Sequence, residues 1–340
     1  MIPRERVLRA LNHQPVDRAP RDLWLLPGVE ADHADDVAEL QVRFPSDILH
    51  LDTKWPVGKR TKGVANRSGH YTDAWGCTWH LGQRGAVGPL MASPLANPEQ
   101  IAGYEPPAEL LEASRAARAV KGCVGSSRFV LAWSDVRPLD RLQSLRGPEA
   151  AVAELSGGPS ALRSLLGRLD DFFRREIELW ASVEVDGVVL GDTLATPEGL
   201  RLPLKTWRSL FRPLYRQYCE ILHARDKFAF FHGGPHTSEI FGELVEAGFD
   251  AIHVPWCQMD LEKMARKYRG RATFWSGIDR QWLDSPATVS DLREAVLQVR
   301  QALDFGAGGV IAQCTWGPEI PIRHVSKFFE EWMISLPAGV

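Results

Sequence analysis

Apolar and polar positions follow a regular block pattern through the last two-thirds of the chain. From about residue 126, short runs of apolar and β-branched residues recur, and each run ends in polar residues. Runs that are nearly continuous in apolar residues are typical of parallel strands buried on both faces. The pattern predicts strands at 126–135, 185–193, 227–234, 249–255, 272–279 and 308–314.

The segments between these runs have helical spacing. In residues 237–248, Ile240, Phe241, Leu244 and Val245 fall on one face, and Gly248 stands where a C-terminal cap is expected. Residues 288–308 repeat the pattern with their own apolar stripe and a closing glycine. Alternating strands and helices predict a parallel sheet with right-handed crossovers.

The first third of the chain is organised differently. Its pattern predicts helices at 1–14 and 33–44, and short strands at 22–26 and 47–52. Residues 53–92 are rich in glycine and alternate in polarity, which is typical of hairpins and predicts an insertion over one end of the sheet. We therefore expect one α/β domain over residues 1–340, a (β/α)8 TIM barrel. The alternative is an open doubly wound sheet, but no glycine-rich phosphate-binding motif follows any strand.

Composition narrows the class of protein. The net charge of −3 argues against a general electrostatic grip on nucleic acid or membrane, and the charged N-terminus does not look like a secretory signal. The five cysteines are scattered and odd in number, as expected of reduced thiols. We expect a cytoplasmic protein, and a homodimer is an open alternative to a monomer. The twelve tryptophans serve either the core or a site for a flat ligand.

Polar and titratable side chains gather where the predicted strands end. In a parallel barrel these positions face the active site, so Asp192, His232 and Cys314 are the leading candidates there. Each also has a structural alternative: a cap for Asp192, a core hydrogen bond for His232 and inert packing for Cys314. Further candidates for substrate binding are Trp24, Trp133, Asp135, His253, Trp275, Asp279 and Trp316.

One pair among these residues has the chemistry of metal ligands. His232 and Cys314 are both ligand types that zinc prefers, and both are predicted to lie at the barrel mouth. Two ligands do not make a zinc site, however. The additional ligand is left open between Glu30, His253, Asp192 and Cys257.

Several segments together resemble the uroporphyrinogen decarboxylase superfamily, in its bacterial, decarboxylase-like branch. They are PRERVLRALNHQPVDRAPRDLW, TDAWGCTW, GDTLATPEGLRLPLKTWRSLFRPLYRQ, FFHGGPHTSEIFGELVEAGFDAIHV and FWSGIDRQ. The resemblance implies a (β/α)8 barrel. It also implies one of two activities, cofactor-free porphyrinogen decarboxylation or zinc-dependent methyl transfer linked to a corrinoid.

Two departures from the family pattern bear on this choice. Decarboxylases carry an arginine-rich N-terminal motif that holds substrate carboxylates, but the comparable stretch here, DLWLLPGVE, has no arginine. Asp47, within SDIL, resembles a catalytic aspartate of those enzymes and stays a candidate. The zinc methyltransferases carry a His-x-Cys motif and a distant cysteine. His232 and Cys314 match that pattern, whereas Gly234 replaces the middle cysteine.

The resemblance therefore favours a methyltransferase that moves a methyl group between a small methylated substrate and a corrinoid (cobalamin) carrier. The implied partner is a corrinoid-binding protein, with zinc at His232 and Cys314 as a Lewis acid and Asp192 as a substrate-orienting or acid–base group. One alternative is a decarboxylase of porphyrin biosynthesis, and another is a non-catalytic barrel that binds a ligand.

Overall fold

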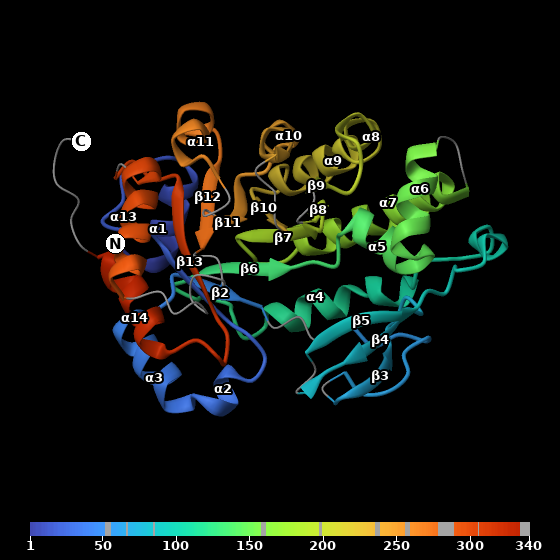
Figure 1. Cartoon of the computed structure of the whole chain (residues 1–340), viewed down its shortest axis with the longest axis horizontal. Coiled ribbons are helices and arrows are strands. Elements are labelled where there is room, and N and C mark those ends of the chain that lie inside the picture. The colour runs from blue at the N-terminus through green and yellow to red at the C-terminus, as the bar shows by residue number, and fades with distance from the viewer. Residues whose placement is uncertain are drawn as a thin grey trace.

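The computed structural model describes residues 1–51, 56–65, 67–83, 86–157, 161–196, 199–234, 239–255, 259–277, 289–304 and 306–333. Its centre is an eight-stranded sheet in the order β1-β13-β12-β11-β10-β7-β6-β2, with parallel pairing throughout the ladder (Figure 1). The strands are β1 (Arg21–Leu25), β2 (Ile48–His50), β6 (Phe129–Trp133), β7 (Gly187–Asp192), β10 (Phe228–Gly233), β11 (Ala251–Pro255), β12 (Thr273–Gly277) and β13 (Val310–Trp316). Each predicted strand is confirmed, and the fold is a nearly closed (β/α)8 barrel.

The two end strands of this order, β1 and β2, meet at a seam. The backbone N–H of Asp47 donates to the carbonyl of Arg21 at 2.9 Å, and the Asp47 carboxylate accepts from the backbone N–H of Arg21 at 2.7 Å. One aspartate therefore ties the two strands together at the point where both begin.

Side chains along the strands alternate between the barrel interior and the surrounding helices, as the period of two requires. One buried cluster fills the interior and contains Phe129, Val189, Phe230, Trp275 and Ile311. A second, larger cluster takes the intervening residues and packs them against the helices. This alternation decides which strand-end residues reach the barrel mouth.

Helix α1 (Pro3–Leu11) closes the bottom of the barrel. Its Val7 and Leu11 belong to the interior cluster, and the N–H of Gly309 donates to the carbonyl of Ala10 at 2.8 Å. Arg6 binds Asp47 at 2.5 Å from the same helix. The N-terminal segment is thus part of the barrel.

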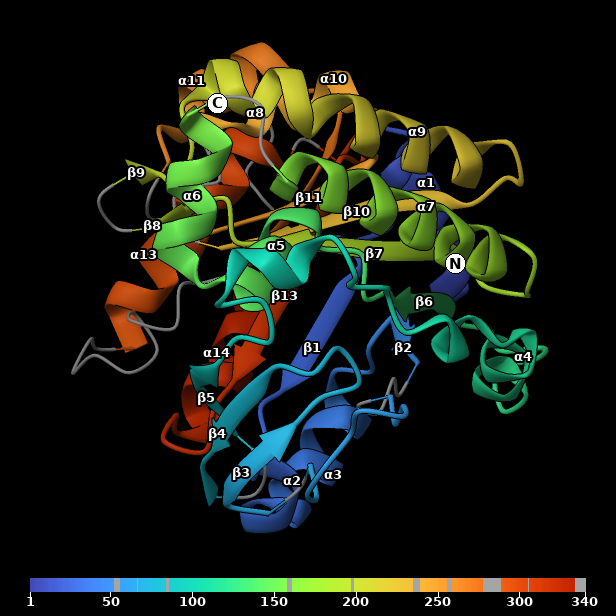
Figure 2. The same ribbon diagram turned by 90° about the vertical axis from the view of Figure 1, so that its right-hand side faces the viewer.

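The remaining helices surround the barrel (Figure 2). Gly248 ends α10 in the left-handed region with φ of 104°, which confirms the predicted cap. These helices are α2 (Val29–Asp32), α3 (Ala34–Arg43), α4 (Ala113–Val120), α5 (Pro138–Arg146), α6 (Pro148–Gly157), α7 (Ala161–Ala181), α8 (Leu204–Leu210), α9 (Arg212–His223), α10 (Phe241–Ala247), α11 (Leu261–Tyr268), α13 (Val289–Leu303) and α14 (Ile322–Glu331). In the part of the chain that is described, no helix is long and apolar enough to span a bilayer.

The predicted insertion contains a three-stranded antiparallel sheet of β3 (Gly69–Thr72), β4 (Thr78–Leu81) and β5 (Val87–Ala92). Trp75, in the β3–β4 turn, packs against Phe172 of α7 with ring centroids 4.8 Å apart, and Arg141 of α5 lies over the same indole. The Cys77 thiol donates to the carbonyl of Ser144. The insertion therefore docks on α5 and α7. A two-stranded ribbon, β8 (Ala195–Thr196) and β9 (Gly199–Leu200), follows β7.

Candidate active site

Six aromatic side chains meet inside the barrel toward the carboxyl ends of its strands. Trp24 is at the centre: its ring centroid lies 5.1 Å from that of His253, 5.2 Å from His232, 5.3 Å from Trp133 and 5.0 Å from Trp275. Trp24, Trp133 and the histidines are half-buried, whereas Trp275 is fully buried beneath them. We call this set the aromatic layer; it consists of Trp24, His50, Trp133, His232, His253 and Trp275.

A fully buried carboxylate, Asp22, lies against this layer. Its Oδ2 accepts hydrogen bonds from the indole N–H of Trp24 at 2.9 Å and of Trp275 at 2.8 Å. Its Oδ1 lies 2.6 Å from Nε2 of His50. The two tryptophans were predicted from the sequence, whereas Asp22 and His50 were not. The available signal was that Asp22 precedes Trp24 by two positions and so shares its face of the predicted strand.

The hydrogen bonds define the protonation of this group. An indole N–H can only donate, and that of Trp133 reaches Nδ1 of His50 at 3.0 Å, so Nδ1 is the unprotonated nitrogen. His50 is therefore a neutral imidazole that donates from Nε2 to Asp22. With three neutral donors and no acceptor around it among the described residues, Asp22 is an ionised carboxylate that none of those residues balances with a positive charge.

His232 and His253 are neighbours in the layer, with ring centroids 4.8 Å apart. Burial lowers the pKa of His253 to about 4, against a small opposing effect from Gln313 and Asp22. Burial, and then the neighbouring His253 and Arg137, hold the pKa of His232 well below its ordinary value. Both imidazoles are thus uncharged near neutral pH and are poor proton donors to a substrate.

The proposed zinc pair does not assemble. On β13, Gln313 faces the interior, where its Oε1 lies 3.3 Å from Nε2 of His253. Cys314, one residue further on, belongs to the outer cluster and is fully buried among apolar groups, which raise the pKa of its thiol. His232 and Cys314 therefore lie on opposite faces of the barrel wall. Among the described residues, no three His, Cys, Asp or Glu side chains converge as metal ligands.

The position of the missing cysteine is also crowded. A Cβ placed on Gly234 would lie 3.2 Å from Cγ2 of Thr193, closer than ordinary contact. Glu30 is exposed on α2. Cys257 and Asp279 lie outside the described residues. Within the described chain, the side chains around His232 do not fit the zinc arrangement that the resemblance implied.

Asp192 points outward from β7, away from the aromatic layer. Its carboxylate accepts from the backbone N–H groups of Leu139 at 2.8 Å and Asp140 at 2.6 Å, and from the Tyr215 hydroxyl at 2.5 Å. Burial, and then the Asp140 carboxylate, raise the pKa of Asp192 to about 8. Leu139 and Asp140 open α5, so Asp192 holds that helix by its N-terminus. This arrangement matches the structural alternative and does not support a substrate-orienting or acid–base role.

Other candidates are also placed away from the layer. Asp47 lies at the start of β2, at the end of the barrel opposite the mouth, where Arg6 and Arg18 neutralise it. We replace its predicted catalytic role by a structural one. The Trp316 indole is fully buried in the outer cluster and donates to the carbonyl of Ile320.

Asp135 turns toward the helices outside β6. Its backbone N–H donates to the Glu176 carboxylate at 2.9 Å, and its own carboxylate lies 3.9 Å from Arg115. Burial and the Asp135 charge raise the pKa of Glu176 to about 7. This carboxylate pair is therefore separate from the aromatic layer.

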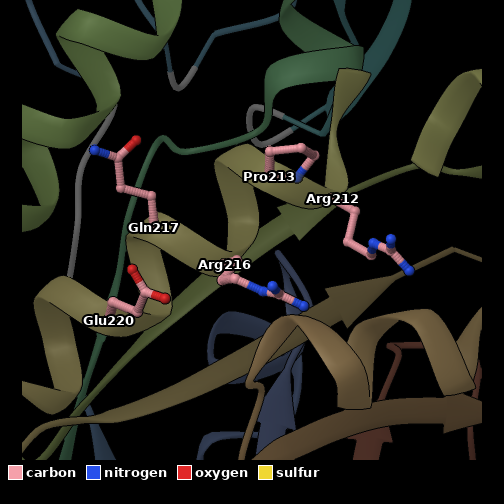
Figure 3. A pocket seen from close by; sticks show the side chains of 5 residues that line it. All are labelled: Arg212, Pro213, Arg216, Gln217 and Glu220. Carbon is pink, nitrogen blue, oxygen red and sulfur yellow. The ribbon is translucent and has the colours of Figure 1, made fainter. Parts of the chain in front are cut away.

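The described surface clefts lie elsewhere. Figure 3 shows one of about 280 Å³ along α9, lined by Arg212, Pro213, Arg216, Gln217 and Glu220. Arg212 lies 3.0 Å from Glu243, a carboxylate that it shares with Arg208 at 2.6 Å. The aromatic layer is the stronger candidate site, because it lies where barrel strands present their ends.

Comparison with known proteins agrees with the fold. A methyltransferase from Methanosarcina mazei superposes with a TM-score of 0.73 over 98% of both chains at 15% identity. A β-N-acetylhexosaminidase has a TM-score of 0.44 at 12% identity, over 94% of this chain and 71% of its own. A B12-independent methionine synthase from Shewanella sp. has a TM-score of 0.43 at 12% identity, over 94% of this chain and 92% of its own.

The sequence comparisons are more specific. No curated protein matches the chain significantly. The family model for uroporphyrinogen decarboxylase (URO-D) matches residues 71–332, which is most of the chain. The protein therefore belongs to the uroporphyrinogen decarboxylase family.

Proposed function

We propose that this protein is a methyltransferase that moves a methyl group from a small methylated substrate to a corrinoid carrier held by a partner protein. The observation that carries the proposal is the aromatic layer, whose indoles and neutral imidazoles form the candidate substrate surface. Such a surface suits a small, weakly hydrated methyl-bearing group. The structural likeness to a methyltransferase, at 15% identity, adds to the case for the fold only.

The same surface argues against a porphyrinogen substrate. A substrate with many carboxylates needs several fixed cations, because each buried carboxylate must be paired. The layer offers too few: Arg137 is the fixed cation that acts on His232, the two histidines have lowered pKa values, and the charge within the layer is the Asp22 carboxylate. Decarboxylation in the manner of the family's name is therefore the weaker candidate.

A reduced corrinoid supplies a strong nucleophile toward methyl groups when it is bound. The residues of this chain would do the remaining work. The indoles of Trp24 and Trp133 would hold the methyl-bearing group and keep water from it, and Asp22 would fix the Trp24 ring through its N–H. We assign no proton transfer to His232, because its pKa is lowered, and none to Cys314, because it faces away.

The test is a methyl-transfer assay with purified protein, reduced cobalamin and a panel of methylated amines, sulfides, sulfonium ions and ethers. We expect methylcobalamin to form with at least one donor, and the rate to fall about tenfold or more in Trp24→Leu. Trp316→Phe is the matched control. Trp316 lies in the outer cluster, between β13 and the helices, so this variant should keep the rate. Failure of every donor, or release of carbon dioxide from uroporphyrinogen, would count against the proposal.

A further inference from the structure

From the buried charge and the rings around it, we infer that the aromatic layer recognises a methylated onium ion, a quaternary ammonium or sulfonium group. For the reaction, this inference rests on the proposed methyl transfer, but for binding it stands independently. It assigns a chemical class to the substrate. It also assigns a specificity role to Asp22, which is the charged group beneath the layer.

The charge of Asp22 favours a cationic ligand. Its carboxylate is fully buried, and the donors that reach it among the described residues are the N–H groups of Trp24, Trp275 and His50, all neutral. A buried charge without a counter-charge is costly, and a cation brought close to it recovers part of that cost. Trp24 follows Asp22 by two positions on β1, and its half-buried indole donates to the Asp22 carboxylate, so a cation against this ring is also close to the carboxylate.

The rings of the aromatic layer favour a cation that carries no N–H donors. Cations without N–H donors, such as quaternary ammonium ions, are bound by the faces of electron-rich rings, and indole is the strongest of these. Trp24 and Trp133 lie 5.3 Å apart between ring centroids, with imidazoles beside them that stay neutral. An onium ion needs no hydrogen-bond acceptor, whereas a primary ammonium would leave its donors unsatisfied on this surface.

Transfer of a methyl group from an onium ion needs no acid to release the leaving group. When a methyl group leaves a neutral amine or ether, the heteroatom must be protonated or bound by a Lewis acid, and the layer provides no acid for this purpose. When it leaves an onium ion, the electron pair of the C–N or C–S bond stays on the heteroatom. The product would then be a neutral amine or sulfide, and the electron pair of the new bond to the methyl group would come from the reduced corrinoid if it is the acceptor. The separation of His232 from Cys314 is consistent with this simpler chemistry.

The test compares choline with 3,3-dimethylbutan-1-ol, which has the same shape but no charge, by titration calorimetry on the whole protein. We expect choline, and tetramethylammonium as a second cation, to bind at least about tenfold more tightly than the neutral alcohol. Equal affinity for the charged and uncharged molecules, or no binding of either cation at saturating concentrations, would overturn the inference. The assay does not depend on methyl transfer, so a cation that binds without being demethylated would contradict the proposed function alone.

Variants distinguish the contribution of the Asp22 charge to choline binding from that of the Trp24 ring. Asp22→Asn should remove most of the preference for choline over the alcohol, whereas Trp24→Phe should weaken it and Trp24→Leu should abolish it. Circular dichroism and urea unfolding report whether each variant folds, and Trp24→Phe serves as the conservative variant if Asp22→Asn does not. Trp316→Phe is the control and should keep the preference. An unchanged preference in a folded Trp24→Leu protein would contradict the assignment.

Discussion

The imidazole of His253 connects the protonation state of the site to the stability of the fold. Burial lowers its pKa from 6.5 to about 4, so between these pH values the unfolded chain binds a proton that the folded protein does not. The free energy of unfolding should therefore be highest above pH 6.5 and should fall as the pH drops toward 4, on the order of 1–3 kcal/mol. Urea unfolding at several pH values measures this slope, and His253→Gln should flatten it. An unchanged slope in that variant would contradict the lowered pKa.

At the residue scale, the failed zinc pair illustrates what the sequence could and could not predict. The strand containing Cys314 was predicted, and so was its place near the end of that strand. Its face was not, because a one-residue error in the alternation reverses inside and outside. The contact between Gln313 and His253 settles it. Asp22 and His50 were missed because their partners come from strands far apart in sequence.

Gly234→Cys tests whether a zinc site can form around His232. It restores the cysteine of the family's zinc motif beside His232, but Cys314 still faces the outer cluster. We expect the variant to gain no tight zinc binding, as measured by metal analysis after dialysis against a weak chelator. We also expect a loss of about 1–2 kcal/mol of stability from the contact with Thr193. Stoichiometric zinc in the variant would show that a ligand set forms around His232 after all.

At the element scale, Asp192 fastens the start of α5 to the end of β7. Its carboxylate accepts from two backbone N–H groups of α5 and from the Tyr215 hydroxyl of α9. Asp192→Ala should lower the free energy of unfolding by about 2–4 kcal/mol, because three buried donors lose their acceptor. Tyr215→Phe, which removes one of them, should cost only about 1 kcal/mol. Loss of turnover in Asp192→Ala with stability unchanged would instead support the catalytic role that the sequence suggested.

The packing of β12 against β13 depends on the absence of a side chain at Gly277. A Cβ on Gly277 of β12 would overlap Oε1 of Gln313, the atom that contacts His253. Gly277→Ala should therefore displace Gln313 and cost about 1–3 kcal/mol in urea unfolding. Gly167, inside α7, has open space around its Cβ position, so Gly167→Ala should stabilise the protein by up to about 1 kcal/mol. Equal effects of the two substitutions would contradict the packing argument.

At the scale of the whole molecule, the apolar runs predicted where the barrel strands lie along the chain, and the family resemblance favoured a barrel over an open sheet. The way in which the barrel closes could not be predicted. It depends on contacts of α1 and Asp47 with distant strands, and the local sequence pattern does not reveal these contacts. The helix predicted at 1–14 closes the bottom of the barrel, where Val7 and Leu11 complete the interior cluster. Asp47, which was predicted to be catalytic, forms an ion pair with Arg6 of this helix. The bottom of the barrel thus serves closure, whereas the proposed ligand site lies at the mouth.

This separation can be tested with one substitution at the bottom. Arg6 binds Asp47 at 2.5 Å and Asp17 at 2.6 Å, and both Arg6 and Asp47 are buried. Arg6→Ala leaves Asp47 with Arg18 as its remaining ion-pair partner in the described chain, so we expect the free energy of unfolding to fall by about 2–4 kcal/mol. Arg43→Ala, which removes an exposed pair with Glu330, should cost less than about 1 kcal/mol. The affinity for choline should stay within about twofold in both variants, because α1 lies at the opposite end of the barrel from the aromatic layer. If Arg6→Ala weakened choline binding as strongly as Trp24→Leu while remaining folded, closure and ligand binding would have to be parts of one cooperative unit.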